Sequence, residues 1–247
     1  MRVGVIADVH ANLEALVACL AHARGQRVDL LAFLGDLVGY GADPVPVLDL
    51  IQAEVAQGAL VVQGNHDAAV LDPRVAATMN PAAAEAIDWT RDQLGAGERA
   101  FLASLPLLAR REGVTFVHAS AEAPEAWLYV SDPVRAAHSL AAAGTRWVLS
   151  GHVHEPALYY TVGDRPLPFK PVPGVAIPVP PRRQWLGIAG SAGQPRDGRT
   201  ASCYVVFDAA GPTLTWHRVA YDWPTAAAKV RAAGLPERLA SRLEHGD

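Results

Sequence analysis

Short apolar runs alternate with longer amphipathic stretches along the first part of the chain. The runs at residues 2–7, 29–34, 59–63, 114–118 and 147–150 are predicted to be buried strands, and residues 12–23, 44–55, 80–94 and 133–143 to be helices. Asn12 and Asn80 stand where a helix needs an N-cap, and Pro44 and Pro81 stand in a first turn. This alternation is typical of βαβ units, so we expect a largely parallel sheet.

The second part of the chain has a different pattern. Residues 158–162, 185–189, 202–207 and 213–219 are predicted to be strands of a mainly antiparallel layer, and residues 223–243 one or two short alanine-rich helices. Residues 164–183 carry seven prolines, which predicts an irregular surface connection; shaping a substrate cleft is its alternative role. Because neither an internal repeat nor a clear linker divides the chain, we expect one domain over residues 1–247.

The composition describes a globular protein without a basic surplus. Of the 247 residues, 51% are hydrophobic and 19% are charged, and the formal net charge is −4. Nucleic-acid binders cluster positive charge, so there is no strong sign of DNA or RNA binding. No stretch approaches the ~18 apolar residues of a membrane span and no signal peptide is visible, so we expect a cytoplasmic protein. Cys19 and Cys203 are expected to be buried, unpaired thiols.

Five short segments place carboxylates, imidazoles and one carboxamide directly after apolar runs. They are Asp8-Val9-His10, Gly35-Asp36, Gly64-Asn65-His66-Asp67, His118 and Gly151-His152-Val153-His154. Ligands of open α/β sheets bind outside the carboxyl ends of the strands, so we expect these segments to converge on one site. A lone histidine at a strand end is more often structural, but five of the nine histidines share this setting. The other four, His22, His138, His217 and His245, are interpreted as structural or solvent-facing.

The residue types divide naturally into ligand sets for two divalent metal ions. Because residues two apart on a strand share a face, Asp8 and His10 are expected to reach the same metal. The first ion is predicted to bind Asp8, His10, Asp36 and His154, and the second Asp36, Asn65, His118 and His152, with Asp36 as the bridge. Oxygen and imidazole ligands suit Mn, Fe, Zn or Ni and do not choose among them. Two metals joined by a carboxylate favour phosphoryl transfer.

The complete motif set resembles that of the calcineurin-like metallophosphoesterase superfamily. Asp8-x-His10, Gly35-Asp36-Leu37-Val38-Gly39, Gly64-Asn65-His66-Asp67, His118 and Gly151-His152-x-His154 follow that superfamily's order and spacing. Residues 190–198 resemble a signature of its small bacterial and archaeal phosphodiesterases, although Ile188-Ala189 replaces the usual Asn-Pro and Ala119 replaces a common glycine. The resemblance implies an α/β fold: an αββα four-layer sandwich of two packed mixed β-sheets flanked by helices.

The expected reaction is in-line attack on phosphorus by a hydroxide that bridges the two metals. His66 lies beside the ligands in sequence and is our candidate for protonating the leaving group. Asp67 is expected either to orient His66 or to serve as an N-terminal carboxylate of the following helix. Arg196 offers a fork for phosphate oxygens or is a solvated turn residue, and Tyr40 either stacks on a base or packs in the core.

Three functional hypotheses follow from these residues. The leading one is a metal-dependent phosphodiesterase or phosphomonoesterase acting on small-molecule or nucleotide-like phosphoesters. The second is a dinucleoside polyphosphate hydrolase or a phosphoprotein phosphatase. The third is a metal-binding scaffold without catalysis, which missing ligands would favour, but no ligand is missing. The metal, the substrate and the oligomeric state stay open.

Overall fold

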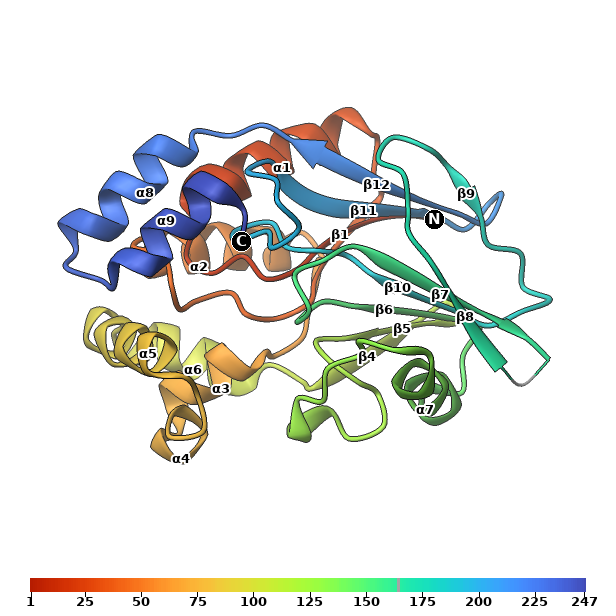
Figure 1. Cartoon of the computed structure of the whole chain (residues 1–247), viewed down its shortest axis with the longest axis horizontal. Coiled ribbons are helices and arrows are strands. Elements are labelled where there is room, and N and C mark those ends of the chain that lie inside the picture. The colour runs from red at the N-terminus through yellow and green to blue at the C-terminus, as the bar shows by residue number, and fades with distance from the viewer. Residues whose placement is uncertain (164) are drawn as a thin grey trace.

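The computed structural model describes residues 1–163 and 165–247 and shows two mixed β-sheets packed face to face with helices outside them (Figure 1). Each sheet has six strands, in the orders β3-β2-β1-β11-β12-β9 and β4-β5-β6-β10-β7-β8. The α/β sandwich that the motif resemblance implies is therefore confirmed. No helix in the described part of the chain is long and apolar enough to cross a membrane.

The first sheet combines a parallel half with an antiparallel half. Its strands are β1 (Arg2–Ile6), β2 (Leu30–Phe33), β3 (Leu60–Val61), β9 (Ile177–Pro178), β11 (Ser202–Asp208) and β12 (Thr213–Val219). Strands β1, β2 and β3 run parallel, and β11 pairs antiparallel with β1. Helices α1 (Leu13–Gly25) and α2 (Pro44–Ala56) connect the parallel strands, and Asn12 caps α1 as expected because its side chain accepts the Ala15 amide proton.

The second sheet is built around three parallel strands. They are β5 (Val114–Val117), β6 (Trp147–Ser150) and β10 (Trp185–Ile188), and the antiparallel strands β4 (Leu108–Arg111), β7 (Ala157–Val162) and β8 (Arg165–Phe169) flank them. Helix α7 (Pro133–Ala143) connects β5 to β6 and lies outside this sheet (Figure 1).

The remaining helices lie at the end of the sandwich where β1, β2, β5 and β6 finish. These are α3 (Asn65–Leu71), α4 (Pro73–Ala76), α5 (Pro81–Gln93), α6 (Ala96–Ser104), a short 3₁₀ turn (Pro124–Ala126), α8 (Trp223–Ala232) and α9 (Glu237–His245). Asn80 caps α5 as expected. Strand β4 and helices α4 and α6 were not predicted, because their short segments carry too little hydrophobic periodicity, and α3 was expected only in one of the two roles of Asp67.

The sheets are held together by apolar side chains from both inner faces. Phe207 and Trp216 of the first sheet lie in the same buried cluster as Phe116 and Leu149 of the second. The Trp216 indole Nε1–H also donates to the Ile188 carbonyl oxygen of the opposite sheet at 2.8 Å. Cys19 and Cys203 are buried and unpaired, as predicted, and burial raises the pKa of both thiols to about 12.

Two predictions for the second part of the chain are wrong. Its strands do not form a layer of their own: β11 and β12 join the first sheet, and β7 and β10 join the second. The proline-rich residues 164–183 are not wholly irregular either, because they contain β8 and β9; Asp164 lies outside the described residues. Both are edge strands, and an edge strand tolerates proline since one side of its backbone needs no partner. One domain over residues 1–247 stays a prediction.

Candidate metal centre

The loops that follow β1, β2, β5 and β6 bring the predicted ligands to one place. Six of the seven ligand side chains are buried, and only Asn65, the first residue of α3, is half-buried. The buried six are Asp8, His10, Asp36, His118, His152 and His154. Residues separated by well over a hundred positions therefore meet inside the protein.

One group of donor atoms comes from Asp8, His10, Asp36 and His154, and these atoms all lie within 4.8 Å of one another. The Nε2 atom of His10 is 3.6 Å from Asp36 Oδ2 and 3.1 Å from His154 Nε2. A second group contains Asp36, His118 and His152, with His118 Nε2 3.5 Å from Asp36 Oδ2. Asp36 is the residue common to both groups, which is the division expected from the sequence. Metal binding by these residues stays a prediction.

Hydrogen bonds orient three of the imidazoles so that their lone pairs face inward. The Nδ1 atoms of His10, His118 and His154 lie 3.3, 2.7 and 2.6 Å from backbone carbonyl oxygens. A carbonyl oxygen only accepts, so each Nδ1 carries the proton and each Nε2 carries a lone pair. The Nε2 lone pairs of His10 and His154 then face each other across 3.1 Å.

In the second group the lone pair of His118 Nε2 meets a further oxygen donor. Asn65 Oδ1 lies 3.0 Å from His118 Nε2, and His152 Nδ1 lies 3.0 Å from the same atom. An amide oxygen that faces an imidazole lone pair repels it, as do the paired lone pairs in the first group. A cation between the donors removes the repulsion in both groups, so these residues fit two metal ions.

Burial makes the site's ionised carboxylates costly without a cation. It raises the pKa of Asp36 to about 7, and together with the neighbouring Asp36 charge it raises the pKa of Asp67 to about 8 and that of Asp8 well above its usual range. Burial also lowers the pKa of His118 to about 4 and that of His152 to about 2, so both imidazoles are neutral. Neutral imidazole is the form that binds a metal.

The ligands stand on strained loops rather than on strands. A left-handed backbone holds Asp8 (φ 54), His10 (φ 50), Asp36 (φ 49), His152 (φ 67) and His154 (φ 66). Asp8 and His10 thus do reach one group, but the expected reason, a shared strand face, is wrong, because β1 ends at Ile6. Strained residues of this kind cost of order 1–3 kcal/mol each and persist where their surroundings enforce them.

Asp67 supplies part of that enforcement. Its Oδ2 accepts the Gly64 amide proton at 2.9 Å, and its Oδ1 accepts those of Leu37 at 2.9 Å and Val38 at 3.3 Å. These bonds cap α3 and tie it to the loop that carries Asp36. Among the described hydrogen bonds of Asp67, none goes to His66. This favours the second of the two expected roles, a helix N-terminal carboxylate, over the orientation of His66.

His66 lies beside both ligand groups. Its amide N–H donates to Asp36 Oδ1 at 2.8 Å, and its Nε2 is 4.0 Å from Asp36 Oδ2. The buried Nδ1 has no hydrogen-bond partner among the described residues. Burial lowers the pKa of this imidazole well below its usual range. His66 is therefore neutral and free to meet a substrate atom.

The two residues expected to bind substrate are Tyr40, which lies against His10 and His66, and Arg196, which lies over Tyr40. The Tyr40 ring is 6% exposed, and its centroid is 4.5 Å from that of His10 and 4.4 Å from that of His66. The guanidinium of Arg196 lies 5.8 Å above the Tyr40 ring. Tyr40 is thus packed against the site, with little of its ring left for a base.

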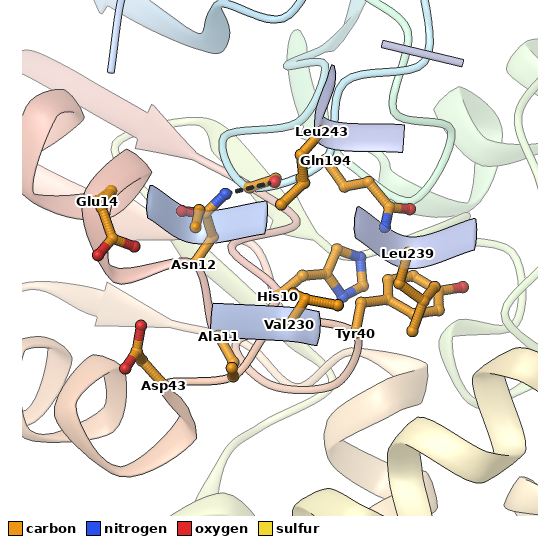
Figure 2. Close-up of a pocket in the computed structure, with 14 residues that line it drawn as sticks. His10, Ala11, Asn12, Glu14, Tyr40, Asp43, Gln194, Val230, Leu239 and Leu243 are labelled. Carbon is orange, nitrogen blue, oxygen red and sulfur yellow. Dashed lines mark hydrogen bonds between the residues drawn. The ribbon is translucent and has the colours of Figure 1, made fainter. Parts of the chain in front are cut away.

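Helices α8 and α9 close the site behind Tyr40. Figure 2 shows Val230 and Leu239 of these helices beside His10 and Tyr40, and Leu243 of α9 beside Gln194. The cavity that they enclose has a volume of about 10 Å³, which is room for about one water molecule. This cavity is therefore too small to hold a substrate.

An open cleft reaches the site from the side of the second ligand group. It measures about 290 Å³ and is bordered by Asn65, His66 and His152, and by Trp127 and Tyr129, which the sequence did not single out. The Tyr129 ring stacks on His152 with centroids 3.9 Å apart, yet 53% of the residue is exposed. The backbone of Trp127 is left-handed (φ 51), and its indole lies edge-on to the His118 ring. Residues 119–132 carry no hydrophobic periodicity from which their place at the site could have been predicted.

Comparison with known proteins places this geometry in a family. The family model described as calcineurin-like phosphoesterase superfamily domain matches residues 1–211. The chain is 34% identical over 246 residues to an uncharacterized protein of Methanocaldococcus jannaschii, and the match covers 98% of this chain and 96% of that protein.

Solved structures show the same likeness. The crystal structure of a metallophosphoesterase from Sphaerobacter thermophilus superimposes with a TM-score of 0.87 and 36% identity, covering 100% of both chains. A hypothetical protein from Pyrococcus horikoshii superimposes with a TM-score of 0.79 over 100% of this chain and 98% of that chain; at 18% identity it shows the shared fold alone.

The shared carboxylate gives a first prediction. Asp36→Asn keeps an oxygen that accepts the His66 amide proton but removes the negative charge common to both groups. We expect affinity at both metal positions to fall by at least the roughly 10–100-fold that loss of a supporting ligand partner costs. Elemental analysis after dialysis checks this, with the exposed Asp88→Asn as the control. Full content of two metals in Asp36→Asn would contradict the bridging role.

The raised carboxyl pKa values give a second prediction, for metal-free protein. Between about pH 7.5 and 8 the folded state keeps a proton on Asp67, and part of one on Asp36, that the unfolded state has lost, so stability falls with pH by about 1.4 kcal/mol per pH unit for each full proton retained. The buried histidines have lowered pKa values, so only the unfolded state protonates them near pH 6.5; their contribution raises stability up to about pH 7.5 and is nearly constant above that pH. Chemical denaturation at three pH values after chelation measures the slope. A flat or rising stability would contradict the expectation.

Proposed function

Because this chain belongs to the calcineurin-like phosphoesterase superfamily, we propose that it hydrolyses phosphodiester or phosphomonoester bonds of small or nucleotide-like substrates with two divalent metal ions. The observation that carries the proposal is the pair of donor groups joined by Asp36, with imidazole lone pairs turned inward. No residue of the expected set is missing or turned away from the site. That completeness argues against a scaffold without catalysis.

The residues that would hold the first ion are Asp8, His10, Asp36 and His154, and those for the second are Asp36, Asn65, His118 and His152. Bound ions supply Lewis acidity, lower the pKa of water and neutralise charge on the phosphoryl oxygens. Mn, Fe, Zn and Ni all suit this mixture of oxygen and imidazole donors.

His66 is the proposed source of the proton for the leaving group. This ring borders both the ligand groups and the open cleft, and it would give up its proton as imidazolium, the form that the negative charge of a bound phosphoryl group favours. Asp67 is a positioning residue, because the hydrogen bonds that it accepts fix the backbone that presents Asn65 and His66. Arg196 is the proposed contact for phosphate oxygens, since its planar fork suits them.

The cleft suggests where the organic part of the substrate lies. Its aromatic wall of Trp127 and Tyr129 offers a ring face close to His152, and about 290 Å³ holds a small group. We therefore assign base stacking to Tyr129 in place of the buried Tyr40. A cleft of about 290 Å³ favours a small molecule over a folded phosphoprotein.

Hydrolysis of bis-p-nitrophenyl phosphate by metal-loaded protein tests the function. We expect activity that chelation abolishes and that added Mn, Zn, Fe or Ni restores. Matched panels of cyclic nucleotides, diadenosine tetraphosphate and phosphopeptides then separate the two enzyme hypotheses. Stoichiometric metal without turnover of any of these substrates would favour the scaffold.

The role of His66 gives a sharper expectation. His66→Ala should keep both metals, because no ligand is removed, and should slow hydrolysis of alkyl phosphoesters by about 10²–10⁴-fold. The effect on p-nitrophenyl esters should be much smaller, since that leaving group departs without a proton. The exposed His138→Ala is the matched control. Equal losses on both substrate classes would reassign His66 to phosphate binding, and loss of a metal would make it a ligand.

A further inference from the structure

Two arginine side chains from distant parts of the chain converge beside the candidate metal centre. Arg196 lies in the loop after β10, and Arg242 lies in the last turns of α9. Arg196 Nη2 donates to Gln194 Oε1 at 3.0 Å, and Arg242 Nη1 lies 3.5 Å from the same oxygen. Two guanidinium groups thus share one neutral acceptor.

Neither guanidinium makes a direct ion pair with a carboxylate of the described residues. Among the ion pairs of residues 1–163 and 165–247, none includes Arg196 or Arg242, whereas Arg218 pairs with Asp197 and Arg231 with Glu237. Arg196 Nε is buried and has no partner in this part of the chain. Like charges that crowd together without a counter-charge are unfavourable, so an anion between them would be bound tightly.

The arginine pair is tied to the metal centre through Gln194. The Gln194 backbone oxygen accepts the Nδ1 proton of His154 at 2.6 Å, while its side chain reaches the two guanidiniums. Arg196 also lies over Tyr40, whose ring touches His10 and His66. Figure 2 shows Gln194 and Tyr40 lining the same cavity as Leu239 and Leu243 of α9. An anion at the pair therefore lies next to, and not on, the ligand groups.

The end of α9 is fixed where the pair needs it. Leu239 and Leu243 are buried, and the Gly198 amide donates to the Gly246 carbonyl oxygen at 2.8 Å. Gly246 has a left-handed backbone (φ 73), and a Cβ there would collide with the Arg199 backbone. Arg242 is thereby held against the Arg196 loop. It lies outside the residues 1–211 that match the family domain.

We infer that Arg196 and Arg242 form a subsite for a second phosphoryl group of the substrate, next to the one that is hydrolysed. This inference rests on the proposed function and narrows it to phosphoesters or phosphoanhydrides with at least two phosphoryl groups. The forked guanidinium suits phosphate geometry and holds its charge at any working pH. The metal ligands take the reacting phosphoryl group, and the pair selects among substrates.

The test compares AMP with ADP, which differ by one phosphoryl group, by calorimetric titration of the metal-loaded protein. The wild type should bind ADP more tightly than AMP. Arg242→Gln should weaken ADP binding by about 10–100-fold, the cost of losing a hydrogen bond to a charged group, and AMP binding by less than about threefold. Arg242→Lys, which keeps the charge without the fork, should recover part of the loss.

Arg238→Gln is the matched control, because it removes the same charge one turn earlier from an exposed position on α9. It should leave both affinities nearly unchanged. Equal weakening of AMP and ADP, no weakening in Arg242→Gln, or no preference for ADP in the wild type would each overturn the subsite. Turnover of bis-p-nitrophenyl phosphate by the same preparation separates the outcomes: activity without ADP preference overturns only the subsite, and ADP preference without activity overturns only the proposed function.

Discussion

The site depends on one constraint: buried donors that repel one another would be stabilised by a cation between them. Three acidic side chains and five imidazoles are removed from water here, and hydrogen bonds to backbone carbonyls leave no freedom for the rings of His10, His118 and His154 to turn their lone pairs away. Burial of an unpaired ionised carboxylate costs several kcal/mol, so the metal-free site favours protonated aspartates, and a cation would stabilise their ionised form. The arrangement of these donors therefore favours a bound cation.

The sandwich fold brings these donors together. Parallel strands from both sheets deliver their following loops to a common end, and the inner apolar cluster around Trp216 and Phe207 fixes the two sheets relative to each other. Asp67 then accepts hydrogen bonds that tie the start of α3 to the loop that carries Asp36. Precision at the ligands thus comes from packing and backbone hydrogen bonds several residues away from any donor atom.

Much of the fold could be predicted from the sequence, because strong periodicity marks strands such as Trp147–Ser150 and helices such as Pro133–Ala143, where prediction and structure coincide. The ligand residues were identifiable because their types recur after strands. What the sequence could not show was set by tertiary contacts. The assignment of β11 to the first sheet depends on pairing with β1 some two hundred residues earlier, and the proline-rich strands exist only because they occupy edges. Trp127 and Tyr129 reach the site through an irregular loop that carries no repeating signal.

The left-handed backbone at the ligands has a consequence for how the site tolerates change. Aspartate, asparagine and histidine are the non-glycine residues that enter this conformation most readily, and they are also oxygen and nitrogen donors. Metal coordination and the left-handed backbone therefore both favour the same few residue types at these positions, which are occupied by Asp8, His10, Asp36, His152 and His154. Alanine scanning would mix two effects at these positions, since alanine removes the donor and also fits the backbone poorly. Asparagine separates them, so the accessible sequence space of this centre consists largely of exchanges among three amino acids.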